Sequence, residues 1–267
     1  MTKSDDKERI SGQPYVVSVV RDFKMYGKCV GDNPCFDGFR KVVFDNNQEN
    51  LAITKRYNSF IDSLGKDEDC WIVFCHEDWR AEENMAAVLK HLDPGKIYGP
   101  IGVFIQHRMI RDYIVPVGKI RMCDKDGGRL IVTGRSAMKH GRVDTLDCQC
   151  VVVHSSLIRK YGLRFDENLL YDMYVEDFCA TAHDRYGIFT EVYPMRCTHF
   201  SYGVLGSSFF NALAYMKGKF KSSYKGYVTT AGDKNTFGFR QDRWKLHHTR
   251  FPRIAMLLNG KVFKRNR

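Results

Sequence analysis

Short apolar runs alternate with helix-patterned segments along the first hundred residues, and this alternation restricts the fold more than any other feature of the sequence. The patterns predict strands at 15–20, 41–44, 70–75 and 97–105, and helices at 51–64 and 80–92. Strands that alternate with helices are typical of a doubly wound sheet. We therefore expect an α/β fold in which helices flank a mostly parallel central sheet.

The positive charge of the chain is concentrated near its C-terminal end. The formal net charge is +11, and residues 217–267 hold fourteen Lys and Arg against two Asp, so the remainder is nearly neutral. We predict one domain over 1–206 and a basic, partly helical extension over 207–267. A nucleic-acid-binding protein is an alternative suggested by the pI near 9.2. A nucleic-acid-binding protein would have basic and aromatic residues spread over a binding face. The near-neutral charge of residues 1–216 does not favour this alternative.

Cysteine usage and the N-terminal residues bear on the cellular compartment. The nine cysteines are an odd number without a CxxC pair, and several lie in apolar runs, so we expect reduced, buried thiols. The first fourteen residues are polar and lack the apolar core of a secretory signal. No apolar stretch is long enough to cross a bilayer. We therefore expect a cytoplasmic protein.

The apolar run CWIVFC ends in His76-Glu77-Asp78. Open α/β sheets bind ligands at the carboxyl ends of their strands. In an extended chain His76 and Asp78 point to one face and Glu77 to the other. Because Mg²⁺ and Mn²⁺ take carboxylate oxygens and substrate phosphates, Asp78 is the candidate metal ligand and His76 the candidate nucleotide contact. An ordinary helix entry is the alternative, since carboxylates suit the positive end of a helix.

Polar residues in the segment FDNNQENLAITKRYNSF could contact a nucleoside. Asp45 and Asn47 follow a predicted strand, and Asn58 lies on the next predicted helix. Amide and carboxylate groups at these positions could bind a base and a ribose. The alternative is a turn, because Asn and Asp favour turns at strand ends.

Two later motifs also carry chemistry-bearing side chains. Glu176-Asp177 opens a helical segment, where one carboxylate could act as a general base or both could stabilise the helix dipole. His199 follows a predicted strand and could give a nitrogen ligand to a cation or lie in the core.

Taken in their order along the chain, these segments resemble a GT-A glycosyltransferase of the family-two-like bacterial branch, whose metal motif is His-x-Asp. The resemblance covers roughly residues 14–205 and rests on DNN…RYN, CHED, VDTLD, GLRFDE, EDFC and HFSYG. It implies a Rossmann-like sheet. It also implies transfer of a sugar from a nucleotide-diphospho-sugar, with a UDP-sugar as first candidate, to a glycan or lipid-linked acceptor in bacterial surface polysaccharide synthesis. The basic segment 106–142 has no counterpart in the family.

The resemblance also implies roles for single residues. These are Asp45, Asn47 and Asn58 for the nucleoside, His76 for the nucleotide, Asp78 and His199 for Mn²⁺ or Mg²⁺, and Asp147, Glu176 and Asp177 for catalysis. Asp177 would take the acceptor proton in a single displacement with inversion. The cation would neutralise the charge that grows on the leaving nucleoside diphosphate.

The basic segment 239–263 interleaves aromatic and aliphatic residues with Arg and Lys. This pattern predicts peripheral binding to an anionic surface at the inner face of the cell membrane, without a nucleic-acid partner. A basic helix packed on the enzyme's own core is the alternative. For the whole chain, a metal-dependent hydrolase or phosphotransferase is another alternative, although neither GxxxxGK[ST] nor HExxH occurs. The carboxylates at 78, 147 and 177 argue against an inactive, donor-binding relative.

Overall fold

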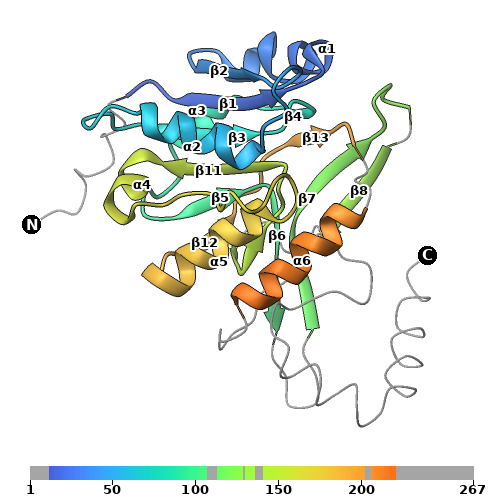
Figure 1. The fold of residues 1–267 in the computed structure, drawn as a ribbon. Coiled ribbons are helices and arrows are strands. Elements are labelled where there is room, and N and C mark those ends of the chain that lie inside the picture. The colour runs from blue at the N-terminus through green and yellow to red at the C-terminus, as the bar shows by residue number, and fades with distance from the viewer. Residues whose placement is uncertain (1–11, 107–112, 129, 136–140, 202–205, 221–267) are drawn as a thin grey trace, which may run out of the picture.

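The structure is a computed structural model, and it describes residues 12–106, 113–128, 130–135, 141–201 and 206–220. Its first three long strands lie side by side and parallel in the order β2-β1-β3 (Figure 1). Their bounds are β1 (Tyr15–Val20), β2 (Arg40–Asp45) and β3 (Trp71–Cys75). Because the three strands run in one direction, their carboxyl ends meet at one edge of the sheet.

Four more strands extend this first sheet. They are β5 (Ile97–Gly99), β9 (Gly141–Val143), β11 (Cys150–His154) and β12 (Thr190–Val192), in the order β2-β1-β3-β11-β5-β12-β9. β11 runs antiparallel to β3 and β5, and β9 antiparallel to β12. The other five strands share one direction. The predicted α/β class is confirmed, and the sheet is mixed rather than wholly parallel.

A second sheet packs beside the first. Its strands are β4 (Trp79–Ala81), β6 (Ile101–Gln106), β7 (Tyr113–Cys123), β10 (Thr145–Leu146) and β13 (Cys197–His199), in the order β10-β6-β7-β13-β4, with β8 (Leu130–Arg135) paired to β7. The single strand predicted over 97–105 is therefore wrong, because Pro100 separates β5 in one sheet from β6 in the other. Proline has no N–H to donate to a continuous ladder.

The described part of the basic segment 106–142 contains a hairpin. β7 and β8 pair antiparallel, with Cys123 at the end of β7 opposite Leu130 at the start of β8. Gly127 has a φ of +79°, and its N–H donates to the carbonyl oxygen of Asp124 at 2.9 Å. Gly127 thus lies in the turn of this hairpin, where glycine suits the positive φ.

The helix predicted over 80–92 is wrong in its first half. Residues Trp79–Ala81 form β4, which pairs with β13, and the helix α3 spans only Met85–Leu89. Asn84 begins α3, because its side-chain oxygen accepts from the N–H of Ala87 at 2.9 Å. Pairing with a strand far away in the sequence therefore overrides the local helical pattern.

The remaining helical elements cover the sheets (Figure 1). They are α1 (Phe23–Tyr26), η1 (Gly27–Gly31), η2 (Pro34–Phe36), α2 (Ile53–Ser63), α4 (Ser155–Tyr161), α5 (Tyr174–Tyr186) and α6 (Ser207–Lys219). The predicted apolar face of α2 is confirmed, since Tyr57, Phe60 and Ile61 are buried.

β3 separates two hydrophobic cores. Ile72 and Phe74 face a core that includes residues of α2, α5 and α6, whereas Trp71 and Val73 face a core that includes residues of η1 and α3. This alternation follows from the two-residue period of a strand. All nine cysteines are free thiols, and seven of them are buried.

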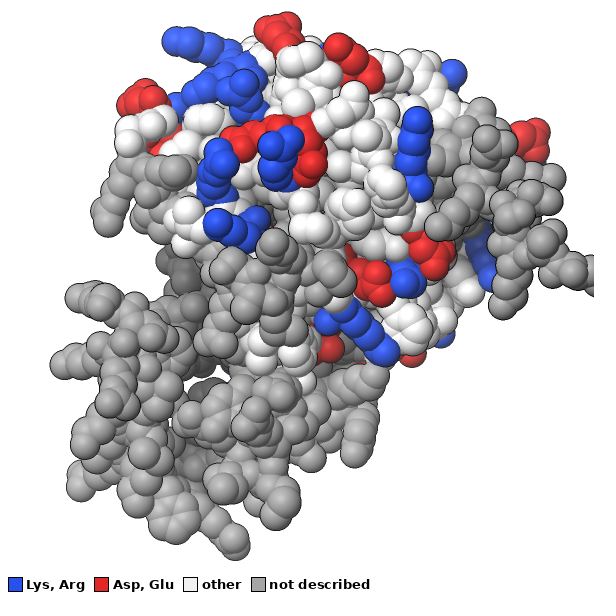
Figure 2. All heavy atoms as spheres, turned by 180° about the vertical axis from the view of Figure 1, so that it is seen from behind, with Lys and Arg blue, Asp and Glu red and all other residues white. Residues whose placement is uncertain are grey.

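Only the first helix of the predicted C-terminal extension lies among the described residues. α6 contributes Phe209, Leu213 and Met216 to the same core as α5. The predicted membrane-binding segment 239–263 lies outside the described residues. Within the described residues, no helix has both the length and the apolar character needed for a bilayer span. On the face shown in Figure 2, acidic and basic side chains of the described residues are interspersed.

Candidate functional site

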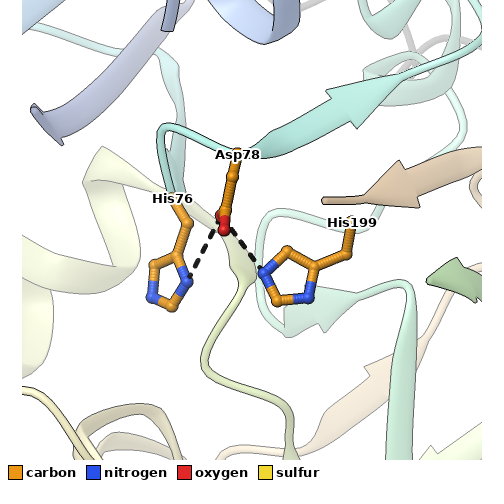
Figure 3. Close-up of side chains that lie close together, drawn as sticks. All are labelled: His76, Asp78 and His199. Atoms are coloured by element: carbon orange, nitrogen blue, oxygen red, sulfur yellow. Dashed lines mark ion pairs between the residues drawn. The ribbon is translucent and has the colours of Figure 1, made fainter. Parts of the chain in front are cut away.

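Glu77 lies between His76 and Asp78 in the turn that follows β3. Its Oε2 accepts from the backbone N–H groups of Arg21 and Asp22, at 2.6 and 2.9 Å, and so fixes the end of β1. The side chains of His76 and Asp78 lie close together (Figure 3). The extended alternation expected here is wrong, because residues 76–78 form a turn between β3 and β4 in which the N–H of Trp79 donates to the carbonyl oxygen of His76 at 3.2 Å.

Pairing of β13 with β4 brings a third side chain to this pair. His199 lies opposite Trp79 in the ladder, and the N–H of Phe200 donates to the carbonyl oxygen of Asp78 at 2.9 Å. The Nε2 of His199 is consequently 3.2 Å from Oδ1 of Asp78, and the Nδ1 of His76 is 4.0 Å from the same oxygen (Figure 3). One potential ligand atom from each residue lies within 4.8 Å of the others. We call these three residues the two-histidine cluster.

The electrostatics of the two-histidine cluster suit a cation. Burial lowers the pKa of His76 to about 4, despite the nearby charge of Asp78, so the ring is neutral at neutral pH. Burial would raise the pKa of Asp78, but the hydrogen bond and charge of His199 lower it to about 2. Burial also disfavours the protonated form of His199. The hydrogen bond to Asp78 and the charge of Asp78 outweigh this effect and raise the pKa of His199. The cluster therefore offers a carboxylate and a neutral imidazole at neutral pH.

The two-histidine cluster also has a buried ring nitrogen without a hydrogen-bond partner among the described residues, the Nδ1 of His76. Buried polar atoms normally have hydrogen-bond partners. An unpartnered Nδ1 beside the potential ligand atoms of Asp78 and His199 therefore fits a bound ion. Two imidazoles and one carboxylate suit a transition ion such as Mn²⁺ better than Mg²⁺, which prefers oxygen ligands. His76, predicted to contact the nucleotide, thus lies among the potential metal ligands with Asp78 and His199.

Asp147, a predicted catalytic carboxylate, interacts electrostatically with the two-histidine cluster. It precedes β11, and its negative charge raises the pKa values of both His76 and His199. Its Oδ1 accepts from the side-chain amide of Gln149 at 2.9 Å. The structure therefore brings Asp147 close to the two-histidine cluster.

Glu176 and Asp177 lie in the first turn of α5 and point in different directions. Glu176 is buried, and its Oε2 accepts from the thiol of Cys148 at 2.9 Å. Asp177 is also buried, and its Oδ1 lies 2.6 Å from Nζ of Lys219 on α6. Burial raises the pKa of Asp177 to about 6, although the charge of Lys219 opposes this shift.

Asp177 lines a cavity of about 180 Å³ together with Asp166, Thr181, Arg185 and Lys219, among other residues. None of the residues of the two-histidine cluster lines this cavity. The roles that the resemblance implies for Asp78 and Asp177 would require both carboxylates to face one reaction centre. Asp177 instead lines this cavity, whereas Asp78 belongs to the two-histidine cluster. The first turn of α5 connects the two, because it holds both Asp177 and Tyr174, which contacts His76.

The three predicted nucleoside residues do not form one group. Asp45, exposed at the carboxyl end of β2, accepts from the backbone N–H and side-chain amide of Asn47 at 2.9 and 3.0 Å. Asn58 is buried on α2 and exchanges hydrogen bonds with the backbone of Phe165 at 2.9 and 3.0 Å. Its amide also donates to Glu167. Asp45 and Asn47 thus lie at the edge where His76 follows β3, whereas Asn58 holds a loop in place.

Two tyrosines near the site were not predicted. Tyr171 stacks on His76 with ring centroids 5.3 Å apart and remains 57% exposed. Tyr174, the first residue of α5, lies 3.1 Å from Nε2 of His76 through its hydroxyl. The sequence signal was only the spacing of both residues before Glu176-Asp177, and that spacing does not reveal a contact with a strand end so distant in the chain.

Comparisons with known proteins found matches among solved structures alone. No protein-family model matches the chain, and no curated protein matches it. Among solved structures, the chain is similar to the crystal structure of GalNAc-T7 with UDP, GalNAc and Mn²⁺, with 11% sequence identity and a TM-score of 0.44. The similarity covers 79% of this chain and 51% of that one, so this chain spans about half of that protein's length. A likeness at this level establishes neither the family nor the activity of the chain.

Proposed function

We propose that the protein is a glycosyltransferase that transfers a sugar from a nucleotide-diphospho-sugar to a hydroxyl group. The observation that carries this proposal is the two-histidine cluster, which lies where β3 ends at the shared carboxyl edge of β1, β2 and β3. Open α/β sheets bind nucleotides and related ligands at this edge. The proposal also uses the sequence resemblance to GT-A glycosyltransferases, whose motifs include the same three residues.

The donor side of the proposed site is formed by the edge of the first sheet. His76, Asp78 and His199 would hold Mn²⁺ or a similar divalent ion, which supplies positive charge to the leaving nucleoside diphosphate. Asp45 and Asn47, at the end of β2 and separated from β3 by β1, would bind the nucleoside, with UDP as first candidate. Asp147, close to the two-histidine cluster, would face the donor sugar.

The acceptor side is assigned to Asp177. With a pKa of about 6, its carboxylate is mainly ionised at neutral pH and can accept a proton from an acceptor hydroxyl. The hydroxyl oxygen then bonds to the anomeric carbon as the bond to the diphosphate breaks, with inversion. Tyr174, which contacts His76, lies one helical turn before Asp177, and side chains at this spacing are neighbours on a helix. This proximity supports a reaction centre that spans the start of α5.

The acceptor class and the cellular setting rest on the sequence. A glycan or lipid-linked acceptor, a role in bacterial surface polysaccharide synthesis and a cytoplasmic, membrane-peripheral location remain part of the proposal. Deleting residues 239–267 and measuring sedimentation with anionic liposomes tests the location. Loss of binding supports it, and unchanged binding contradicts it.

A thermal-shift panel tests the proposed function. UDP-, GDP-, dTDP- and CMP-sugars are added to the full chain with and without Mn²⁺. We expect one nucleotide class to stabilise the protein only when Mn²⁺ is present, because ligands that bind the folded state raise its melting temperature. Stabilisation by no donor would contradict the proposal. Donor cleavage that never yields a glycosylated acceptor would favour the hydrolase alternative.

A further inference from the structure

The hydroxyl of Tyr174 lies between a backbone carbonyl and the ring of His76. It donates to the carbonyl oxygen of Cys148 at 2.6 Å, and Nε2 of His76 is 3.1 Å from the same hydroxyl. All three groups are at least partly buried, and Tyr174 is 1% exposed. Water therefore competes little for these hydrogen bonds.

The direction of these hydrogen bonds follows from elementary chemistry. A carbonyl oxygen can only accept, so the single phenolic proton of Tyr174 is directed at Cys148. The phenolic oxygen is then left to accept. The nearby hydroxyl of Tyr57 donates its own proton to the carbonyl oxygen of Cys75 at 3.3 Å, so Nε2 of His76 is the donor to Tyr174 and carries the ring proton. A neutral imidazole has one N–H, and Nδ1 consequently keeps its lone pair.

We propose that Tyr174 is a positioning residue that fixes the Nε2–H tautomer of His76 and thereby makes Nδ1 the cation-binding atom. The Nδ1 lies 4.0 Å from Oδ1 of Asp78 and has no hydrogen-bond partner among the described residues. The cation part of this inference rests on the proposed function, whereas the tautomer does not. Partners behind a metal-binding histidine select its tautomer and orient its ring.

The surroundings of Tyr174 keep this arrangement rigid. Its ring packs against Tyr57 and Phe165, with centroids 6.0 and 5.8 Å apart. The opposite partner of His76 is Tyr171, whose ring is stacked within 20° of parallel. The His76 ring is thus oriented before any cation arrives.

Nitrogen NMR of the metal-free, full-length protein tests the tautomer directly. We expect the imidazole signals of His76, assigned by comparison with His76→Asn, to show protonated Nε2 and unprotonated Nδ1. Tyr174→Phe should give a mixture of tautomers. Tyr171→Phe is the matched control, because it removes a hydroxyl from the other tyrosine next to His76 while keeping the ring, and it should retain the wild-type tautomer.

Calorimetric titration with Mn²⁺ completes the test. Loss of a partner behind a ligand typically weakens metal binding about 10- to 100-fold, so we expect this loss for Tyr174→Phe and not for Tyr171→Phe. Protonated Nδ1 in the wild type, or an unchanged tautomer and Mn²⁺ affinity in Tyr174→Phe, would overturn the inference. A wild type with protonated Nε2 that binds no Mn²⁺ would support the tautomer and contradict the proposed function, so the two failures are distinguishable.

Discussion

The Nε2 of His199, the last residue of β13, lies 3.2 Å from Oδ1 of Asp78, which follows β3. The two residues are distant in the sequence and meet because β13 pairs with β4 immediately after Asp78. The two sheets therefore join at the candidate cation site. Any change that separates β13 from β4 should open the site as well as weaken the fold.

The role of Asp177 can be separated from donor binding. We expect Asp177→Asn to lower turnover by about 10²- to 10⁴-fold, the usual contribution of a general base, while donor affinity stays nearly unchanged. Asp184→Asn, an exposed change on the same helix, is the control and should keep full activity. Steady-state kinetics with a donor binding assay provide the measurement. A parallel loss of donor affinity would count against the assignment.

The buried carboxyl of Asp177 should also contribute to the pH dependence of the free energy of unfolding. Its pKa is raised to about 6 in the folded chain, so its protonated form stabilises folding below the ordinary pKa near 4. This stabilisation is lost as the pH rises through about 6, by up to about 1.4 kcal/mol for each pH unit. Unfolding of wild type and Asp177→Asn across this window measures the difference. A constant difference in stability would refute the shift.

Asn58 and Asp45 should respond differently to substitution. Asn58→Ala leaves the backbone groups of Phe165 without partners and should cost about 1–3 kcal/mol of stability, with little effect on donor affinity. Asp45→Asn keeps an oxygen for the turn at Asn47 and should weaken donor binding without destabilising the fold. Denaturant unfolding and donor titration of both variants provide the measurements. The opposite pattern would return Asn58 to the nucleoside site.

Two glycines with positive φ provide a test of the packing between the sheets. Gly118 has a φ of +86°, and an added Cβ would overlap the carbonyl oxygen of Pro100. Gly162 has a φ of +61°, with open space around an added Cβ. We expect Gly162→Ala to cost about 1–2 kcal/mol, from backbone strain alone, and Gly118→Ala to cost clearly more. Equal losses in thermal unfolding would show that β7 and Pro100 are not in such close contact.

The sequence predicted the parts of the fold that depend on local patterns. The parallel strands β1, β2 and β3 and the apolar face of α2 follow from periodicity, whereas residues 76–78 form a turn in place of the extended geometry expected there. The helix predicted from residue 80 failed because β4 is stabilised by β13, a partner that no local pattern reveals. Pro100 divides a continuous apolar run between two sheets for a similar reason.

The candidate site was predicted in its chemistry more fully than in its geometry. Asp78 and His199 were paired by resemblance, but their contact depends on the register of β13 against β4, and the inclusion of His76 depends on the turn that follows β3. The direction of Asp177 toward Lys219 depends on the packing of α6, which the sequence of α5 does not specify. The contact of Tyr174 with His76 likewise needs the tertiary structure.

The most direct test of the central claim is a calorimetric titration of the wild-type protein with Mn²⁺, followed by a UDP-sugar. The variants are His76→Ala, Asp78→Asn and His199→Ala, and the exposed His91→Ala is the control. We predict that one Mn²⁺ binds to the wild type and to the control, and that the donor binds only after Mn²⁺. Each cluster variant should weaken Mn²⁺ binding by more than about 100-fold, which exceeds the usual cost of losing a partner behind a ligand. Mn²⁺ binding of equal strength in all four variants, or none in the wild type, would contradict the account.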